Sequence, residues 1–433
     1  MTGQPAPHLP DSISRARRHP LGAAVTVAEL SNDPHPALAR LRADEPVSWV
    51  PVLNGWLVTR RDLAIAVMRD SAAYTVDDPR FSTARIVGPS MLSLDGPQHD
   101  RHRRPFTAPF SRVSVHDQLA AFVAGEADRL TRAMRPAGRG DLSRSLAAPL
   151  AVAVVARALG LGRVDPGIIL SWYDAIVGAV SRLAASPGPD DGPPSPGPGA
   201  RSRNAAVAAG TAAFRELSGS LAAVIESGAG SSLLAAAAQP GRPAAAGLST
   251  AEIVSNAAVL MFGGIETTEG MIANAAWHLL SHPAQLDLVR ADPGLLPQAI
   301  EESLRLEPAA AVVDRYVTRD VELAGAAISR GDLVSVSVAG AGRDPAAFTD
   351  PDRFDVRRGN PGQNLAFARG PHFCLGVHLA RLEAHAALTA ALGRLAGLRL
   401  DPDRPAAPRG LVFRKPPALP VLWDAARGDG GPG

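Results

Sequence analysis

The sequence predicts a mainly α-helical protein with small β-sheets, and two patterns support this fold class. Apolar residues recur at steps of three and four through most of the 433 residues, which is typical of amphipathic helices. Segments that alternate β-branched and other residues, as strands do, are few and short. Hydrophobic residues make up 46% of the chain, so a sizeable core can form. This length allows two or three domains, but we find no internal repeat and expect one domain over 1–433.

Helices are expected wherever the three- and four-residue period is sustained. The segments are 36–42, 61–69, 114–134, 146–159, 166–183, 205–227 and 249–281. Strands are expected at 47–57 and 333–338, because β-branched residues alternate there. The segment 323–331 predicts a turn-linked strand that leads into the second of these.

Three segments are expected to lack regular structure. Residues 186–204 are so rich in proline and glycine that they predict a mobile loop between two helices. We also expect a disordered N-terminus over 1–20 and a flexible tail over 426–433.

Charge balance and cysteine content exclude several classes of protein. Lysine and arginine total 44 against 42 aspartate and glutamate residues, which is no nucleic-acid-binding composition. The single cysteine cannot close an intrachain disulfide, and residues 1–20 are polar where a signal peptide needs an apolar core. The most apolar helical stretch, 253–265, contains Ser255 and Asn256 and is too short and polar to span a membrane. We therefore expect a cytoplasmic protein, and the abundance of alanine, arginine, glycine and proline indicates a bacterial source.

The longest expected helix begins at a capping-box pattern formed by Ser249 and Glu252. His282 and Pro283 give its expected end. At 1.5 Å per residue the helix is roughly 45 to 50 Å long. A helix of this length crosses a whole domain, so its middle is expected to be buried.

The middle of this helix, residues 263–268, combines paired glycines, a carboxylate and hydroxyls. Two adjacent glycines lose roughly 2 kcal/mol of helix propensity relative to alanine, and a buried carboxylate needs partners or a proton. The glycines would let a large group approach the backbone, Thr267 can bend the helix by bonding a carbonyl one turn back, and Glu266 can relay protons. This pattern predicts a pocket that handles oxygen. The alternative is a kinked helix in which Glu266 pairs with an arginine.

Cys374, the only cysteine of the chain, lies in the stretch FARGPHFCLG. Four roles are open to it: a buried filler, a nucleophile, a zinc ligand or a haem ligand. Zinc is the weakest, since structural zinc sites need several Cys or His residues at close spacing. A nucleophile needs a base within reach, and His372 in an extended turn would point elsewhere. Filler is the usual role of an isolated cysteine.

The neighbours of Cys374 favour haem over filler. Gly370, Pro371 and Gly376 shape a turn against which a flat ligand can lie, and residues 375–392 are then expected to form a helix. The dipole and free N–H groups at the start of this helix favour a thiolate, the form of cysteine that ligates metal.

The residues around Cys374 resemble the cysteine motif of the cytochrome P450 family, Phe-x-x-Gly-x-His-x-Cys-x-Gly. Phe367, Gly370, His372, Cys374 and Gly376 match it, and the resemblance to soluble bacterial members extends over almost the whole chain. It implies the P450 fold, a single domain with haem b bound between the long central helix and the cysteine loop. It also implies that Cys374 is the axial ligand of the haem iron, with Phe367 and Gly376 beside the haem.

The long helix resembles the family's oxygen-binding signature, (Ala/Gly)-Gly-x-(Asp/Glu)-Thr, at Gly263, Gly264, Glu266 and Thr267. The resemblance implies that Glu266 and Thr267 assist the protonation of dioxygen and that Gly264 lies against the haem. Two departures stand out: Ala368 where glycine is common, and Gly263 where alanine is common. Neither removes a catalytic group.

The resemblance also implies a set of residues that hold the haem carboxylates. They are His99, Arg103, Arg315 and His372, residue types that form charge-assisted hydrogen bonds. For His99 and Arg103 taken alone, a solvated basic helix face is the simpler interpretation, since they lie in the charge run DRHRR. Their joint occurrence with the cysteine motif favours haem.

Glu302 and Arg305 match the family's Glu-x-x-Arg pair, and Arg353 matches the arginine that completes its ion-pair network. These three residues are expected to be structural. The substrate pocket implied by the resemblance is formed by small or aliphatic side chains. They are Ile86, Val87, Leu260, Gly263, Ala310, Ala311, Val312, Leu411 and Val412.

Together these residues predict a haem-thiolate monooxygenase that hydroxylates or epoxidises a bulky, largely apolar small molecule, with 186–204 as a lid. Because Glu266 and Thr267 are both kept, O2 with reductant is favoured over peroxide as the oxidant. The chain has no reductase module of its own, so the resemblance implies a ferredoxin and a ferredoxin reductase as electron donors. Two alternatives stay open: another haem reaction on the same fold, such as oxidative coupling or desaturation, and a haem-binding sensor or carrier without turnover.

Overall fold

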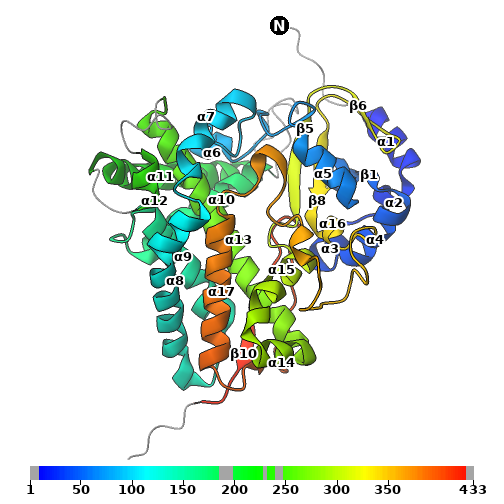
Figure 1. The fold of residues 1–433 in the computed structure, drawn as a ribbon. Helices are drawn as coiled ribbons and strands as arrows, with labels where there is room; N and C mark the ends of the chain where they lie inside the picture. Colours follow the sequence, from blue (N-terminus) through cyan, green and yellow to red (C-terminus); the bar gives the residue numbers. More distant parts are fainter. Residues whose placement is uncertain (1–8, 185–197, 228–231, 239–246, 426–433) are drawn as a thin grey trace, which may run out of the picture.

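The computed structural model describes residues 9–184, 198–227, 232–238 and 247–425 (Figure 1). Helices dominate this part of the chain, and its strands form a five-stranded, a three-stranded and a two-stranded sheet. The predicted fold class, mainly α with small sheets, is confirmed. In Figure 1 the longest helices lie on one side of the molecule and the five-stranded sheet on the other.

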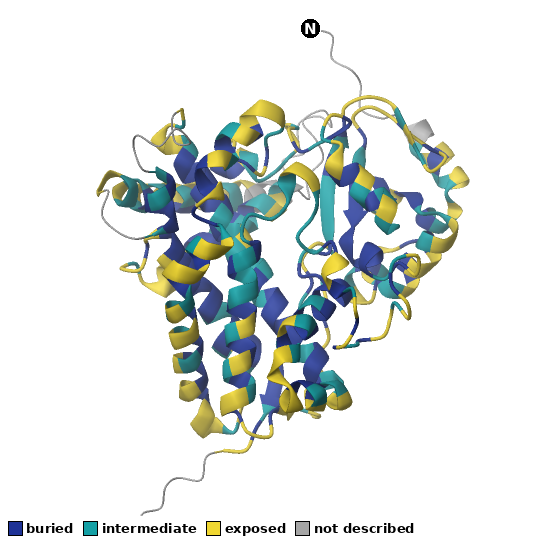
Figure 2. Ribbon diagram, in the orientation of Figure 1, coloured by how far each residue is buried: buried dark blue, intermediate teal, exposed yellow. Residues whose placement is uncertain are grey.

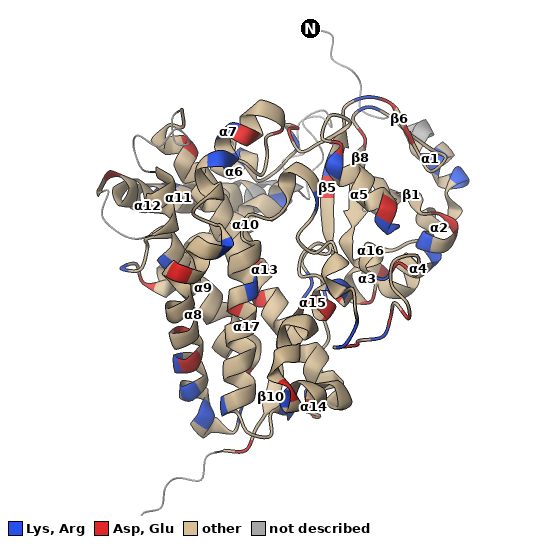
Figure 3. Ribbon diagram, viewed as in Figure 1, with Lys and Arg blue, Asp and Glu red and all other residues tan. Residues whose placement is uncertain are grey.

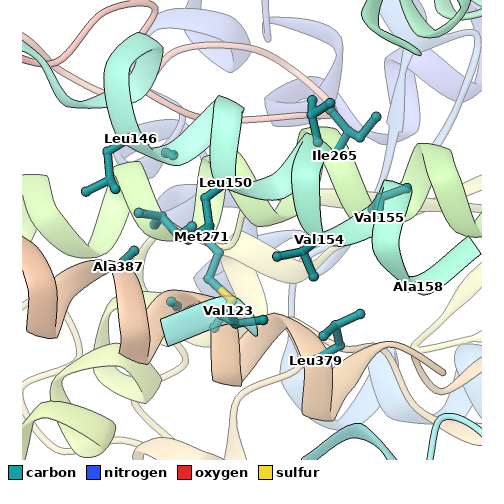
Figure 4. Packing of buried hydrophobic residues seen from close by; sticks show 14 of the residues in the cluster. Val123, Leu146, Leu150, Val154, Val155, Ala158, Ile265, Met271, Leu379 and Ala387 are labelled. Carbon is teal, nitrogen blue, oxygen red and sulfur yellow. The ribbon is translucent and has the colours of Figure 1, made fainter. Parts of the chain in front are cut away.

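Four helices surround the main hydrophobic core. They are α8 (Arg112–Met134), α9 (Ala148–Leu159), α13 (Thr250–Ser281) and α17 (Val377–Arg394). Helices α8 and α17 bury one side and expose the other, as the amphipathic period predicts, whereas α9 and α13 are buried on nearly all sides (Figure 2). Figure 4 shows the resulting contact, in which Val123 of α8, Leu150 of α9, Met271 of α13 and Ala387 of α17 meet.

Helix α13 has the predicted start and end. The Ser249 side chain accepts a hydrogen bond from the N–H of Glu252, and the Glu252 side chain accepts one from the N–H of Ser249. At 32 residues the helix is roughly 48 Å long. It packs against α9, α11, α15 and α17, so its middle is surrounded by other helices.

The remaining helices cover the core and the sheet. They are α1 (Leu9–Arg18), α2 (Pro20–Ala23), α3 (Val27–Asn32), α4 (His35–Asp44), α5 (Arg61–Arg69), α6 (Ala84–Val87), α7 (Gly96–Thr107), α10 (Pro166–Ala184), α11 (Pro198–Ser227), α12 (Leu233–Ala238), α14 (Pro283–Ala291), α15 (Leu296–Leu306) and α16 (Val338–Gly342). A π-helical segment, Ser143–Ala147, runs into α9 where the sequence predicted the helix start. None of the helices in the described ranges combines the length and apolar character needed to cross a membrane.

The five-stranded sheet has the order β1-β2-β8-β5-β3. Its strands are β1 (Val47–Val50), β2 (Gly55–Val58), β3 (Tyr74–Thr75), β5 (Val312–Val317) and β8 (Leu333–Ser337). Strand β2 pairs with β8 in parallel and the other neighbours pair antiparallel. The three-stranded sheet has the order β4 (Arg139–Asp141), β10 (Pro420–Leu422) and β9 (Arg399–Leu400). The two-stranded sheet pairs β6 (Val321–Leu323) with β7 (Ala326–Ile328).

The prediction of one strand over 47–57 is wrong, because this segment is a hairpin. Strands β1 and β2 are joined by a 3-10 turn, Pro51–Leu53, and Asn54 adopts the left-handed conformation at φ 47°. Proline favours the start of a turn, and the Asn-Gly pair at its end tolerates positive φ. The segment 323–331, expected as a turn-linked strand, contains β7, which follows a turn at Ala324 and pairs with β6.

The prediction of disorder over 1–20 is wrong for Leu9–Arg18, which form α1. Arg15 anchors this helix to the sheet, because its Nη1 donates to Oδ2 of buried Asp332 at 2.8 Å. Residues 198–204, expected as the end of a loop over 186–204, belong to α11, which begins at Pro198. The rest of that loop, residues 1–8 and the tail 426–433 lie outside the described residues.

Charged residues of both signs are mixed over the face of the molecule shown in Figure 3. This distribution agrees with the nearly balanced charge of the sequence, which is +2 at pH 7.

Candidate active site

Cys374 lies in the loop between a 3-10 turn, Gly370–His372, and helix α17. Its N–H donates to the carbonyl oxygen of Phe367 at 2.9 Å, which closes the loop. Gly370 has φ +75°, and a Cβ there would overlap the carbonyl oxygen of Met68 on α5. Glycine is therefore required at this position to let the loop pack on α5. Helix α17 begins at Val377, two residues later than predicted.

The Cys374 loop faces the middle of α13 across a cavity of about 290 Å³. Cys374, Phe367 and Gly376 line it from the loop, and Gly263, Gly264 and Thr267 line it from α13. The structure thus brings together the two motifs that the sequence singled out, which are 107 residues apart from Thr267 to Cys374. Most of the lining is aliphatic or aromatic, so a large flat apolar group fits between them.

Burial raises the pKa of the Cys374 thiol, and three nearby groups oppose this effect. They are the N–H of Gly376 and the guanidinium groups of Arg103 and Arg381. The helix start and these two arginines thus supply the positive environment that a thiolate needs.

The predicted carboxylate-binding residues gather at one edge of the cavity. The rings of His99 and His372 lie 4.5 Å apart, and Arg103 donates to the carbonyl oxygen of Phe373 at 2.5 Å. Arg315 is buried on β5, on the same face of the strand as Val313, which lines the cavity. Burial, followed by His372 and Arg103, lowers the pKa of His99.

The ring atom Nε2 of His99 is buried and has no hydrogen-bond partner among the described residues. A buried polar nitrogen without a partner is costly, which indicates that this atom bonds to a group that the protein itself does not supply. A haem carboxylate at this edge would fill that need. The residues present therefore fit the group that the sequence motif implies.

Asp95 is part of this cluster and was missed by the sequence reasoning. Its Oδ1 lies 2.8 Å from Nε2 of His372, and its Oδ2 accepts from Oγ1 of Thr75 and from the N–H of Val76. Burial alone would raise the pKa of Asp95, but these hydrogen bonds hold it below its usual value. Asp95 fixes the ring of His372, and no motif in the sequence marks it.

Thr267 and Glu266 lie on different sides of α13. The Thr267 hydroxyl donates to the carbonyl oxygen of Gly263 one turn back, as predicted, and Thr267 lines the cavity. Glu266 does not line it. Its Oε2 accepts from the Tyr173 hydroxyl at 2.8 Å, and its Oε1 lies 2.9 Å from Nζ of Lys415. The alternative in which Glu266 pairs with an arginine is therefore wrong.

The two adjacent glycines of α13, Gly263 and Gly264, have different functions. A Cβ on Gly263 would meet nothing within 4 Å, because this residue opens onto the cavity. A Cβ on Gly264 would come within 2.5 Å of Cγ2 of Val155. Gly264 therefore lets α9 pack closely on α13, in addition to lining the cavity.

Only some of the residues predicted for the substrate pocket line the cavity beside Cys374. Leu260, Gly263 and Ala310 line the cavity beside Cys374. Ile86 and Val87 do not line it, because α6 turns both side chains into the main hydrophobic core. Met91 and Leu92, a few residues later, line the cavity instead.

Four other predicted pocket residues line a second cavity of about 400 Å³. They are Ala311, Val312, Leu411 and Val412. Successive side chains of a strand point to opposite faces, so Val313 faces the cavity of Cys374 while Val312 and Asp314 face the second one. The alternation of side chains along β5 thus places neighbouring residues of one strand in two different cavities.

The ion-pair network on α15 contains Glu302 and Arg305, as predicted, but not the side chain of Arg353. Arg305 bonds both carboxylate oxygens of Glu302, at 2.7 and 2.8 Å. Arg358 completes the network, with its Nε 2.9 Å from Oε1 of Glu302. The Arg353 side chain is 63% exposed, and only its carbonyl oxygen joins the network, as an acceptor from Arg305 and Arg358. The assignment of Arg353 is therefore wrong.

Glu383 on α17 is a second residue that the sequence reasoning missed. It lines the cavity, its Oε2 is buried without a partner among the described residues, and burial raises its pKa well above the usual value. Burial of this kind favours the protonated form of a carboxyl group, which can donate a proton. Its only sequence signal is a lone acid within an apolar helical run.

Comparisons with known proteins agree with the motifs. A model of the cytochrome P450 family matches residues 229–418. The cytochrome P450 monooxygenase PikC of Streptomyces venezuelae is 35% identical over 427 residues, covering 92% of this chain and 93% of its own. Nocardicin C N-oxygenase of Nocardia uniformis subsp. tsuyamanensis is 33% identical, covering 94% of this chain and 98% of its own.

A solved structure supports the same assignment. The crystal structure of CalO2 superimposes with a TM-score of 0.80 at 32% identity, covering 92% of this chain and 98% of its own. The sequence identity, the shared fold and the cysteine motif that lines the cavity all indicate the same family. The chain belongs to the cytochrome P450 family of haem-thiolate proteins and is a monooxygenase.

Proposed function

We propose that Cys374 binds the iron of haem b and that the enzyme hydroxylates or epoxidises a bulky, largely apolar small molecule. One observation carries this proposal: the only cysteine of the chain and Thr267 of α13 line the same cavity from opposite sides. Haem held by a cysteine thiolate supplies the activation of dioxygen when it is bound.

The protein side of the mechanism starts with binding and orientation. His99, Arg103, Arg315 and His372 hold the haem carboxylates, and the partnerless Nε2 of His99 supports this role. Asp95 keeps the ring of His372 oriented. The apolar walls contributed by α9 and α13 exclude water from the oxidised carbon of the substrate.

Proton delivery is assigned to Thr267 and Glu266. The Thr267 hydroxyl reaches the cavity wall and holds a proton at Oγ1. Glu266 is partly exposed and lies outside the cavity, where it takes protons from solvent and passes them toward Thr267. The acid is therefore a link between solvent and cavity.

The substrate class follows from the lining. Met91, Leu92, Leu260, Val313 and the other side chains that face the cavity are mostly aliphatic, which supports a largely apolar secondary metabolite as substrate. Nocardicin C N-oxygenase, by its name, oxidises a nitrogen. Oxygenation at nitrogen is therefore a second candidate reaction for this chain.

A ferredoxin, reduced by a ferredoxin reductase, is the proposed electron donor. Arg61, Arg69, Arg369 and Arg381 gather near the Cys374 loop, where burial and the other three arginines lower the pKa of Arg369. A cationic patch close to the haem ligand suits an acidic ferredoxin. The cytoplasmic location predicted from the sequence remains part of this proposal.

The test is the spectrum of the purified protein with haem. The ferrous carbonyl complex is expected to have the long-wavelength Soret band of a sulfur-bound iron, and Cys374→Ser is expected to lose it. Failure to take up haem, or a wild-type spectrum without that band, would overturn the assignment. A screen for compounds that change the iron spin state then identifies substrates.

A further inference from the structure

The cavity of about 400 Å³ lies on the other side of strand β5 from the Cys374 cavity. It is lined by residues of α3, α4, the turn between β1 and β2, strands β2, β5 and β8, and the segment 411–412. No residue of the described ranges lines both cavities. The second cavity is therefore a separate space and not an extension of the site assigned to the haem.

Most of the lining of this second cavity is aliphatic. Leu30 of α3, Leu38 of α4 and Leu57 of β2 contribute to it. Val52 and Val412 also line it and are 45% and 41% exposed, so solvent reaches the cavity beside these two side chains. An apolar pocket of this size with a few polar groups is the usual form of a small-molecule binding site.

The polar groups of the second cavity come from the pairing of β5 with β8. The register places Asp314 opposite Ser335 and Val312 opposite Ser337, and all four side chains line the cavity. The Ser335 hydroxyl donates to Oδ1 of Asp314 at 2.7 Å. Oδ2 of Asp314 accepts no hydrogen bond from any residue that the structure describes. One oxygen of this carboxylate is thus bound within the sheet, and the other is available to a ligand.

Asp314 lacks a counter-ion, whereas the other charged residue of the lining has one. Nε of Arg414 lies 2.6 Å from Oε1 of Glu307, and its other nitrogens donate to backbone carbonyl oxygens. Within the described part of the chain, no lysine, arginine or histidine forms an ion pair with Asp314. Arg315, next in the strand, donates to the backbone carbonyl oxygen of Asp314 and not to its carboxylate. The ionised cavity therefore carries one unbalanced negative charge.

The cost of this charge identifies the kind of ligand. Burial raises the pKa of Asp314, although Ser335 and Arg315 oppose this effect, so a cation beside the carboxylate would stabilise its ionised form. The described residues contain no group of three or more His, Cys, Asp or Glu side chains that could hold a metal ion. An organic cation with an apolar body matches both the unbalanced carboxylate and the aliphatic walls.

We propose that the second cavity binds a largely apolar small molecule that carries one amine, with the ammonium against Asp314 and the apolar part along the aliphatic walls. This inference goes beyond the proposed function, because the site is separate from the Cys374 cavity and its occupation requires no turnover. It assigns a ligand to Asp314, whose carboxylate no other described residue neutralises.

The test measures binding of two probes to the haem-bound enzyme by isothermal titration calorimetry. The first probe is octyltrimethylammonium, whose nitrogen has no lone pair and cannot ligate iron. The second is 1-octanol, which has the same apolar chain without the charge. The wild type is expected to bind the cation at least about tenfold more tightly than the alcohol, because only the cation pairs with a partly buried carboxylate.

Four variants locate the site. Asp314→Asn keeps an acceptor for Ser335 and is expected to abolish the preference for the cation. Asp287→Asn is the matched control, since the Asp287 side chain is 72% exposed on α14 and its charge lies at the surface. Val412→Trp, at an exposed position of the lining, is expected to weaken the binding of both probes. Leu260→Trp fills the Cys374 cavity instead and is expected to leave both affinities unchanged.

Four outcomes would overturn the proposal. They are no binding of either probe to the wild type, equal affinity for the two probes, a preference for the cation that survives Asp314→Asn, and loss of binding in Leu260→Trp but not in Val412→Trp. If Asp314→Asn does not fold, the preference of the wild type and the comparison of Val412→Trp with Leu260→Trp still decide. No readout depends on product formation, so failure of the proposed monooxygenation leaves this test intact.

Discussion

Arg358 closes the buried ion-pair network on α15, with its Nε 2.9 Å from Oε1 and 3.0 Å from Oε2 of Glu302. Glu302 is fully buried and accepts from two guanidinium groups, while the Arg353 side chain is mostly exposed. The network ties α15 to the segment that precedes the Cys374 loop, so it stabilises the side of the site opposite α13.

Arg358→Ala is expected to lower the free energy of unfolding by about 3 kcal/mol, because a buried carboxylate loses one of its two cations. The measurement is chemical denaturation followed by circular dichroism. Arg353→Ala is the control and is expected to change stability by less than about 0.5 kcal/mol, since its side chain lies at the surface. Equal losses in the two variants would contradict the assignment of Arg358.

The adjacent glycines of α13 are expected to respond oppositely to alanine. Gly264→Ala places a methyl group within 2.5 Å of Val155, so α9 must shift and stability is expected to fall by about 1–3 kcal/mol. Gly263→Ala meets no atom within 4 Å and is expected to gain up to about 1 kcal/mol of helix propensity. Thermal unfolding of both variants measures whether each substitution raises or lowers the stability of the fold. Destabilisation by Gly263→Ala would contradict the open space at that position.

Thr267→Ala is expected to divert reductant from product into peroxide, because the cavity loses the hydroxyl assigned to proton delivery. The rate of product formation is expected to fall by on the order of tenfold or more, while substrate still binds. Peroxide and product are measured together against reductant consumed. Thr211→Ala, which removes a similar back-bonded hydroxyl from α11, is the control. Unchanged coupling in Thr267→Ala would count against this function.

Stability at acid pH is expected to depend on Glu307. Burial opposes its ionisation, but His35 and Arg414 lower the pKa of Glu307 to about 2, against an ordinary value of 4.5. Because the pKa is lower in the folded state, the ionised Glu307 carboxylate stabilises the fold fully at pH values above the unfolded-state pKa of 4.5. This stabilisation is lost as the pH falls to about 2. The stability advantage of the wild type over Glu307→Gln, measured by urea unfolding, should therefore shrink across that window. A difference that stays constant with pH would contradict the lowered pKa.

Local signals in the sequence predicted most of the helices and the start of α13. The capping box at Ser249 and Glu252 uses residues three apart, so the sequence holds all the information that forms it. The hairpin over 47–58 was missed because apolar residues are buried throughout both strands, although Asn54 and Gly55 mark the turn. The helix α1 was missed because its anchor, Asp332, lies 317 residues away.

The residues of the candidate site were likewise predicted only where a local sequence motif marks them. Phe367, Cys374, Glu266 and Thr267 were found because short motifs carry them. Asp95, Arg358, Tyr173 and Lys415 make contacts between segments far apart in the chain, and no spacing in the sequence marks these residues.

By itself the sequence determined the helical fold class, the thiol of Cys374 and the acid and alcohol on the long helix, because periodicity and motifs are properties of neighbouring residues. Only the tertiary structure decided which arginine neutralises Glu302, which face of β5 meets the Cys374 cavity, and which side chains hold Glu266. The physical reason is that a buried charge is stabilised by whatever donor the packing brings within about 3 Å, and packing is a property of the whole chain.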